Sequence, residues 1–148
     1  MVKASGGDRW RHRMDAVRTA LEEAKAVDVG FMPGAKYPDG TPVALVAAVQ
    51  NFGAPSRGIP PRPFFTEMIR ERSGEWPQAI KEFLKVGDFN TKDALEHMGE
   101  LIKGELQQKI NTFQGVPLAA ATIKKKGFDK QLVDTSHMIN SVDYQVVK

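Results

Sequence analysis

The sequence contains no cysteine and no long apolar run, and its charges nearly balance. The absence of cysteine excludes disulfide frameworks, thiolate zinc sites and cysteine nucleophiles. No apolar run approaches the roughly 20 residues that span a bilayer, so we expect no membrane partner. The first nine residues lack the apolar stretch of a secretory signal, which predicts a protein that stays where it is made.

The size and composition predict one globular unit. The chain has 148 residues, 41% of them hydrophobic and 26% charged, which is typical of a folded domain. We expect a single domain over residues 1–148, with residues 1–7 flexible around Ser5-Gly6-Gly7. The formal net charge is only +3, and this small excess does not by itself indicate the basic face that binds nucleic acid.

Apolar residues near the N-terminus repeat at steps of three and four, which predicts an amphipathic helix. They are Trp10, Met14, Val17, Leu21 and Ala24. We expect Trp10 to lie in the core or in an interface. Arginines alternate with acidic residues on the other faces of this helix. A solvated surface is the plainer interpretation, and an arginine patch for nucleic acid is the alternative.

Two short segments alternate apolar and polar residues, the period of a half-buried strand. The first contains Val27, Val29 and Phe31, and the second contains Val142 and Tyr144. The remaining periodic segments are helical. The sequence therefore predicts an α+β fold: a small antiparallel sheet, with strands near 27–32 and 141–147, packed with several helices.

The helices are predicted from period and caps. Residues 43–52 favour a short apolar helix ended by Gly53, with a strand as the rival because of the β-branched content. The longest helix is expected near 91–113, capped by Asn90 or Thr91. It contains Gly99 and Gly104, which suggests that at least one marks a close approach of a neighbouring backbone. Shorter helices are expected after residue 64, after Pro77, over 117–123 and over 132–139.

Searches for chemistry find little in this sequence. His12, His97 and His137 do not share metal-ligand spacing, although Asp93 could contact His97 at the i, i+4 spacing. No phosphate-binding glycine loop or nucleophile elbow is present. We therefore predict no catalytic residue, no metal site and no cofactor. An unrecognised hydrolase remains a third, less favoured hypothesis.

The densest positive run is Lys124-Lys125-Lys126. Three successive lysines usually form a solvated loop. The alternative is contact with nucleic-acid phosphates or with an acidic partner. A nucleic-acid-binding module that uses the basic N-terminal helix and the lysines of 124–130 is therefore our alternative function.

Three segments in this order resemble the tail-component family of long-tailed bacteriophages, the tail-completion or neck proteins. Residues 43–53 end in Gln-Asn-Phe-Gly, similar to the family's apolar stretch ending in Glu-Phe-Gly. Residues 59–65 read Ile-Pro-Pro-Arg-Pro-Phe-Phe, similar to its Pro-x-Arg-Pro-Phe signature. Residues 117–142 resemble its closing pattern, with Pro-Leu, Thr-Ile, Lys-Gly, Leu-x-Asp-Thr, Met and Ser in sequence.

The resemblance implies a non-enzymatic α+β protein that acts in virion assembly. Such a protein would lie in the host cytoplasm during assembly and then in the virion. Its partners would be copies of itself, in a ring that forms either in solution or only on a template, and other head–tail connector or tail proteins. The sequence departs from the family at Asn51, where glutamate is frequent, and at Ser136, where glycine is frequent.

The stiff proline segment and its neighbours are the predicted protein-interaction residues. They are Asn51, Phe52, Arg62, Pro63, Phe64 and Phe65. Prolines preorganise a segment for docking, and arginine and aromatic residues are enriched in interface cores. The alternative is that Phe64 and Phe65 attach the loop to the chain's own core, with Arg62 paired to an internal carboxylate.

Overall fold

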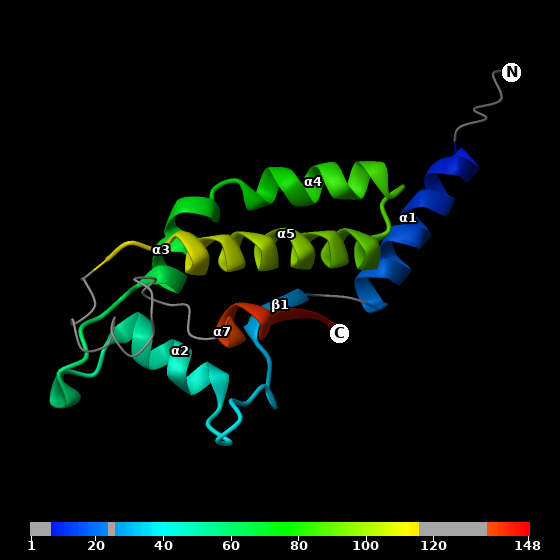
Figure 1. Ribbon diagram of the computed structural model, residues 1–148. Coiled ribbons are helices and arrows are strands. Elements are labelled where there is room, and N and C mark those ends of the chain that lie inside the picture. The colour runs from blue at the N-terminus through cyan, green and yellow to red at the C-terminus, as the bar shows by residue number, and fades with distance from the viewer. Residues whose placement is uncertain (1–6, 24–25, 116–135) are drawn as a thin grey trace, which may run out of the picture.

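The computed structural model describes residues 7–23, 26–115 and 136–148. These residues form helices packed with a small antiparallel sheet, so the α+β prediction is confirmed (Figure 1). The elements in chain order are α1 (Gly7–Glu23), β1 (Ala26–Phe31), α2 (Val43–Phe52), the short 3-10 helix η1 (Pro55–Arg57), α3 (Phe64–Arg72), α4 (Trp76–Val86), α5 (Thr91–Thr112), α7 (His137–Asn140) and β2 (Val142–Val147).

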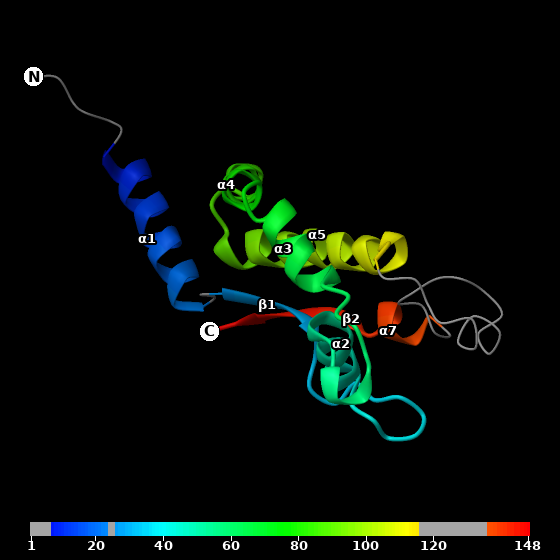
Figure 2. The same ribbon diagram turned by 90° about the vertical axis from the view of Figure 1, so that its left-hand side faces the viewer.

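Helix α5 is the long central element, as predicted for residues 91–113. It begins where the sequence places the cap, because the Asn90 side chain accepts a hydrogen bond from the Asp93 N–H at 3.2 Å. Helices α3 and α4 lie along one side of α5, and the sheet and α2 lie on the other (Figures 1 and 2). Every layer of the fold is therefore built on α5.

The sheet joins the two ends of the described chain. Strands β1 and β2 pair antiparallel, with Val29 opposite Tyr144 and Phe31 opposite Val142. Residues opposite each other share a face, so the alternating apolar residues of both strands lie on one side of the sheet. This side faces α5, and the other side carries exposed polar residues such as Asp28 and Gln145.

The sheet lies so close to α5 that one position must be glycine. A Cβ atom at Gly99 would clash with the ring of Tyr144, whereas a Cβ at Gly104 would contact none of the described atoms. The expectation that at least one of the two glycines marks a close approach is confirmed for Gly99. The approach is to the tyrosine ring of β2.

Residues 43–52 form the helix α2, and the rival strand interpretation is wrong. Val43 and Ala47, one turn apart on α2, are buried together with Phe64 and Met68 of α3 and Leu106 of α5. Packing of one helical face decided the structure over the β-branched content, because tertiary contacts override weak intrinsic propensity.

Helix α1 forms as predicted, but Trp10 and Met14 of its apolar stripe are not in the core. Trp10 is 65% exposed and Met14 is also exposed. Figures 1 and 2 show α1 at one edge of the fold, where it contacts α5 but projects past the layers around it. The expectation that Trp10 is a core residue is wrong, and the interface alternative is taken up below.

Parts of the C-terminal predictions lie outside the described residues. This applies to the helical turn over 117–123 and to the first half of the helix over 132–139; helix α7 (His137–Asn140) overlaps its second half. Ser136, at the position of the family's glycine, has φ 59° and ψ 7°. The left-handed conformation that favours glycine is therefore adopted by a serine.

We expect Gly99→Ala to lower the free energy of unfolding by about 2 kcal/mol, because the added methyl overpacks the contact with Tyr144. The matched variant Gly104→Ala should raise it by about 1 kcal/mol through helix propensity alone. Urea denaturation of the two variants measures both changes. Equal effects at the two positions would show that the sheet does not pack against α5 at Gly99.

Candidate functional site

The proline segment is folded back against the end of α2. The backbone groups of Ala54 and Ile59 exchange hydrogen bonds of 2.9 and 3.1 Å across η1. Gly53 ends α2 at φ 74°, and a Cβ there would lie 2.8 Å from both the Ile59 carbonyl oxygen and the Pro61 nitrogen. The chain can make this close turn only with glycine at position 53.

Arg62 joins the proline segment to α2 from inside the fold. Its side chain is only 7% exposed. Its backbone N–H donates to the Gln50 carbonyl at 2.7 Å, and Nη1 donates to Gln50 Oε1 at 2.9 Å. Nε is buried without a hydrogen-bond partner among the described atoms. No described carboxylate forms an ion pair with Arg62, so the expected internal carboxylate partner is not found there, and the amide of Gln50 takes its place.

Asn51 holds the start of α3 in place. Its Oδ1 accepts hydrogen bonds from the backbone N–H groups of Phe65 and Thr66 at 3.1 and 3.2 Å, and its Nδ2 donates to Thr66 Oγ1 at 2.8 Å. The N-cap position of α3 is Pro63, which makes no side-chain cap. A side chain of α2 therefore satisfies N–H groups that would otherwise lack acceptors.

The six predicted interaction residues differ in their exposure to solvent. Arg62, Phe64 and Asn51 are buried, and Pro63 and Phe65 are half-buried. Only Phe52 lies openly on the surface, 73% exposed. Both Phe64 and Arg62 fill the chain's own interior, and Phe64 belongs to the core, as the core alternative expects. Contact of either residue with a neighbouring protein stays a prediction.

The side of α2 that points away from these buried residues is apolar and exposed to solvent. Leu45 and Phe52 are exposed on the same side of α2, two turns apart, and Ala44 and Ala48 are exposed as well. We name these four residues the α2 face. Leu45 and the alanines are not among the residues predicted from the sequence, although a helix that is apolar on all sides indicates a second burial partner.

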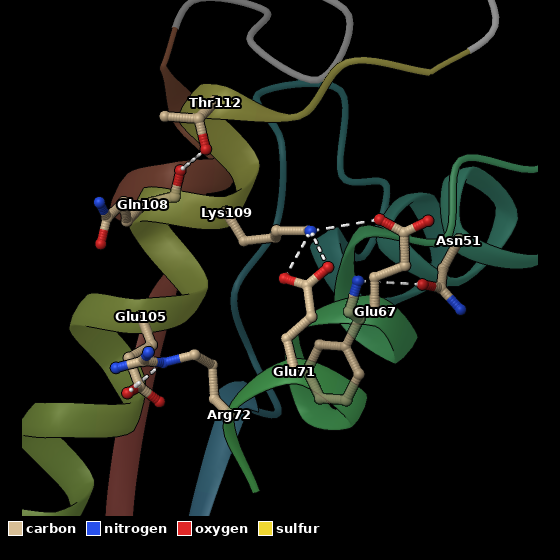
Figure 3. A network of polar contacts seen from close by, with 9 residues as sticks. Asn51, Glu67, Glu71, Arg72, Glu105, Gln108, Lys109 and Thr112 are labelled. Atoms are coloured by element: carbon tan, nitrogen blue, oxygen red, sulfur yellow. Dashed lines mark hydrogen bonds and ion pairs between the residues drawn. The ribbon is translucent and has the colours of Figure 1, made fainter. Parts of the chain in front are cut away.

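A network of hydrogen bonds and ion pairs links α3 to α5 (Figure 3). Glu105 accepts from Arg72 Nε and from Trp76 Nε1, both at 2.9 Å. Lys109 contacts Glu67 at 3.2 Å and Glu71 at 2.9 Å. The groove between the helices has a volume of about 320 Å³, and its lining includes Met68 and Glu71.

The charges in this groove neutralise one another. Burial alone lowers the pKa of Lys109, but hydrogen bonds and charges from Glu71 and Glu67 outweigh it and raise the pKa. The hydrogen bond to Glu105 raises the pKa of Arg72. Both cations therefore stay charged and paired, which stabilises the packing of α3 on α5.

Two of the three histidines contact backbone carbonyl groups. His97 Nδ1 lies 2.7 Å from the Asp93 carbonyl oxygen, so the helix backbone takes the place expected for the Asp93 carboxylate. His137 Nε2 lies 2.8 Å from the Lys36 carbonyl oxygen, and its ring stacks on Tyr37. Within the described ranges, no group of three or more histidine, aspartate or glutamate residues could hold a metal ion.

The basic residues of the alternative function are only partly described. Lys124, Lys125 and Lys126 lie outside the described residues. On α1, Arg13 contacts Asp88 at 3.8 Å and Arg18 contacts Asp15 at 3.7 Å, so two of the helix's arginines already face carboxylates. None of the described helices is long and apolar enough to cross a bilayer.

We expect Asn51→Ala to lower the free energy of unfolding by about 2 kcal/mol, because two N–H groups at the start of α3 lose their acceptor. Asn51→Asp keeps an acceptor oxygen beside the positive end of the helix dipole and should lose less than half as much. Chemical denaturation at neutral pH compares them. If both variants lose the same stability, the cap is not what Asn51 contributes.

Replacement of Glu105 by alanine should lower the free energy of unfolding by about 2–3 kcal/mol, since it strips a buried acceptor from Arg72 and Trp76. Glu82, which pairs with Lys85 on exposed α4, is the control. Its replacement by alanine should change stability by less than about 0.5 kcal/mol. A small effect at Glu105 would mean that the network in Figure 3 does not brace the helices.

Comparisons of the chain with protein-family models, with curated proteins and with solved structures give no match to any of them.

Proposed function

We propose that this chain is a non-enzymatic morphogenesis protein of a tailed bacteriophage or prophage. It would be a tail-completion, neck or minor tail component that acts by self-association and by contact with other virion proteins. It would work in the host cytoplasm during assembly and remain in the virion. The observation that carries the proposal is the exposed α2 face. On the buried side of α2, residues of the segments that resemble the phage family attach this helix to the rest of the fold.

The motif residues support this proposal by how they are used. Gln50, Asn51 and Arg62 belong to two of the segments that resemble the phage family, and together they fix α2 to the proline segment and to α3. The motif therefore does not display reactive side chains. It fastens one helix at a fixed angle, with Phe52 and Leu45 outward, which is what a docking element requires.

Energetics also favour docking at the α2 face. A preformed helix loses little conformational entropy when a partner binds. Aromatic residues at the centre of a contact supply much of its binding energy, and Phe52 is largely exposed. An exposed apolar helix face without such a use would promote nonspecific association.

The nucleic-acid alternative has less support. Its lysines at 124–126 are not among the described residues, and Arg13 and Arg18 of α1 already lie near acidic groups. Nucleic-acid binding through phosphates would weaken steeply as salt rises, whereas apolar docking would persist. A DNA-binding titration over a salt series therefore separates the two functions.

We expect Phe52→Ser to weaken self-association about 30-fold, the loss of about 2 kcal/mol that a central aromatic contact contributes. Light scattering over a concentration series measures it. Ile69→Ser removes another exposed apolar residue and should leave association unchanged. Unchanged association of Phe52→Ser, together with tight salt-sensitive binding of DNA, would contradict the proposal.

The source genome tests the class of function separately. Genes for capsid, portal or tail-tube proteins on either side of this gene are expected. In a phage that carries the gene, Phe52→Ser should reduce the titre of infectious particles, and Ile69→Ser should not. A metabolic operon around the gene would contradict the assembly role.

A further inference from the structure

The exposed large apolar residues of the described chain gather in two places. Six of the seven lie in two groups, and only Ile69 lies apart. One group is the α2 face with Leu45 and Phe52. The other consists of Trp10, Met14, Val86 and Phe89, which we name the α1 end.

The α1 end is formed by α1 and the loop between α4 and α5. Arg13 of α1 lies 3.8 Å from Asp88 of this loop, which places the two segments next to each other. In this loop Asp88 and Phe89 have φ of 49° and 65°, and the Phe89 N–H closes α4 by donating to the Leu84 carbonyl at 2.7 Å. This turn leaves Val86 88% exposed beside the helix.

Helix α1 has few packing contacts with the rest of the described chain for a helix of its length. It has 17 residues and a stripe at positions 10, 14 and 17, but most of its residues are exposed. An isolated helix of about this length is only marginally stable in water, and helices in proteins are stabilised mostly by packing of an apolar face. A partner on the stripe would supply that packing.

The two surfaces lie at opposite ends of the molecule. Both views show α1 on the far side of α5 and the sheet from α2 (Figures 1 and 2). The α1 end of one molecule therefore faces away from its own α2 face, but it is free to reach the α2 face of a second copy. Contacts between two different patches are heterologous, and they close into rings when the rotation between copies allows.

We infer that the α1 end of one copy docks on the α2 face of the next, so that copies assemble head to tail. This inference rests on the proposed self-association and specifies its two surfaces. The partner is a second copy of this chain because the chain itself carries both apolar surfaces, each at helical spacing. Trp10 and Met14 would pack against Leu45 and Phe52, and the small Ala44 and Ala48 leave room for the large indole.

The area available matches a stable contact. At about 150–250 Å² for each aromatic and somewhat less for each aliphatic side chain, the two surfaces together expose about 800 Å² of apolar area. Interfaces are about 57–65% apolar, so this corresponds to about 1,300 Å² of total buried surface. That value lies within the standard range of about 1,200–2,000 Å².

The test uses two complementary variants. Trp10→Ser with Met14→Ser disables the α1 end, and Leu45→Ser with Phe52→Ser disables the α2 face. Each variant alone should stay monomeric at concentrations where the unmodified chain associates. Mixed in equal amounts they should form a dimer that does not grow, because each supplies the surface that the other lacks. Dimer formation also shows that both variants are folded.

Light scattering of the mixture distinguishes the outcomes. Monomers in the mixture, while the unmodified chain still associates, would overturn the head-to-tail inference and leave self-association intact. Unchanged oligomers of the α1-end variant would overturn it equally, since the α2 face would then pair with itself. Salt-sensitive binding of DNA at α1, without association, would overturn both this inference and the proposed function.

A cross-linking experiment covers weak association. Because the chain has no cysteine, Met14→Cys on one preparation and Leu45→Cys on another provide unique attachment points for a short bis-maleimide. The mixed preparations should give a cross-linked dimer in high yield. Lys81→Cys, on exposed α4, replaces Met14→Cys in the control and should give little. Equal yields from the two mixtures would overturn the inference.

Discussion

The contact between Tyr144 of β2 and Gly99 of α5 is the constraint on which the layers depend. A two-stranded sheet is at best marginally stable in water, and here it is made from segments at opposite ends of the described chain. It persists because its apolar side packs on α5, and the packing is close because position 99 has no side chain. The same helix carries Leu106 and Ile110 into the core shared with α2 and α3. The position of α2, and so of its exposed face, follows from that packing.

Buried Arg62 shows how the proline segment is attached rather than what it binds. A charged group removed from water is unfavourable unless other groups replace the lost hydrogen bonds. Gln50 supplies an amide oxygen, and the last turn of α2, which contains Gln50, carries the negative end of the helix dipole. Removal of one partner would leave the other unpaired in the interior. The arrangement therefore favours one geometry between α2 and the loop, and this suits a surface that must be presented in a fixed orientation.

Much of the fold could be predicted from local pattern, and the candidate site could be predicted only in part. The period of three and four gave α5 and the cap at Asn90, and alternation gave both strands to within a residue. Pattern could not tell whether Phe64 faces inward, because an aromatic after a proline segment suits a core and an interface equally. Leu45 was missed for the opposite reason: in a helix that is apolar on every side, the sequence does not show which side the core covers. Tertiary packing determines both orientations. Phe64 packs in the core against the face of α2 that carries Val43 and Ala47, and Leu45 is left on the exposed face.

Helix α1 presents the same ambiguity in a sharper form. Its stripe has the spacing of a buried helix face, yet the fold leaves Trp10 mostly exposed. If α1 only solubilised the chain, its exposed positions would not need a tryptophan and a methionine four residues apart. An isologous pairing of two α2 faces would leave that stripe without a role. A head-to-tail contact uses the α1 end of one copy and the α2 face of the other, so the pair still has one free surface of each kind for further copies. Growth of such an assembly ends only when the last copy meets the first, so the placement of the α1 end relative to the α2 face determines whether the product is a closed ring.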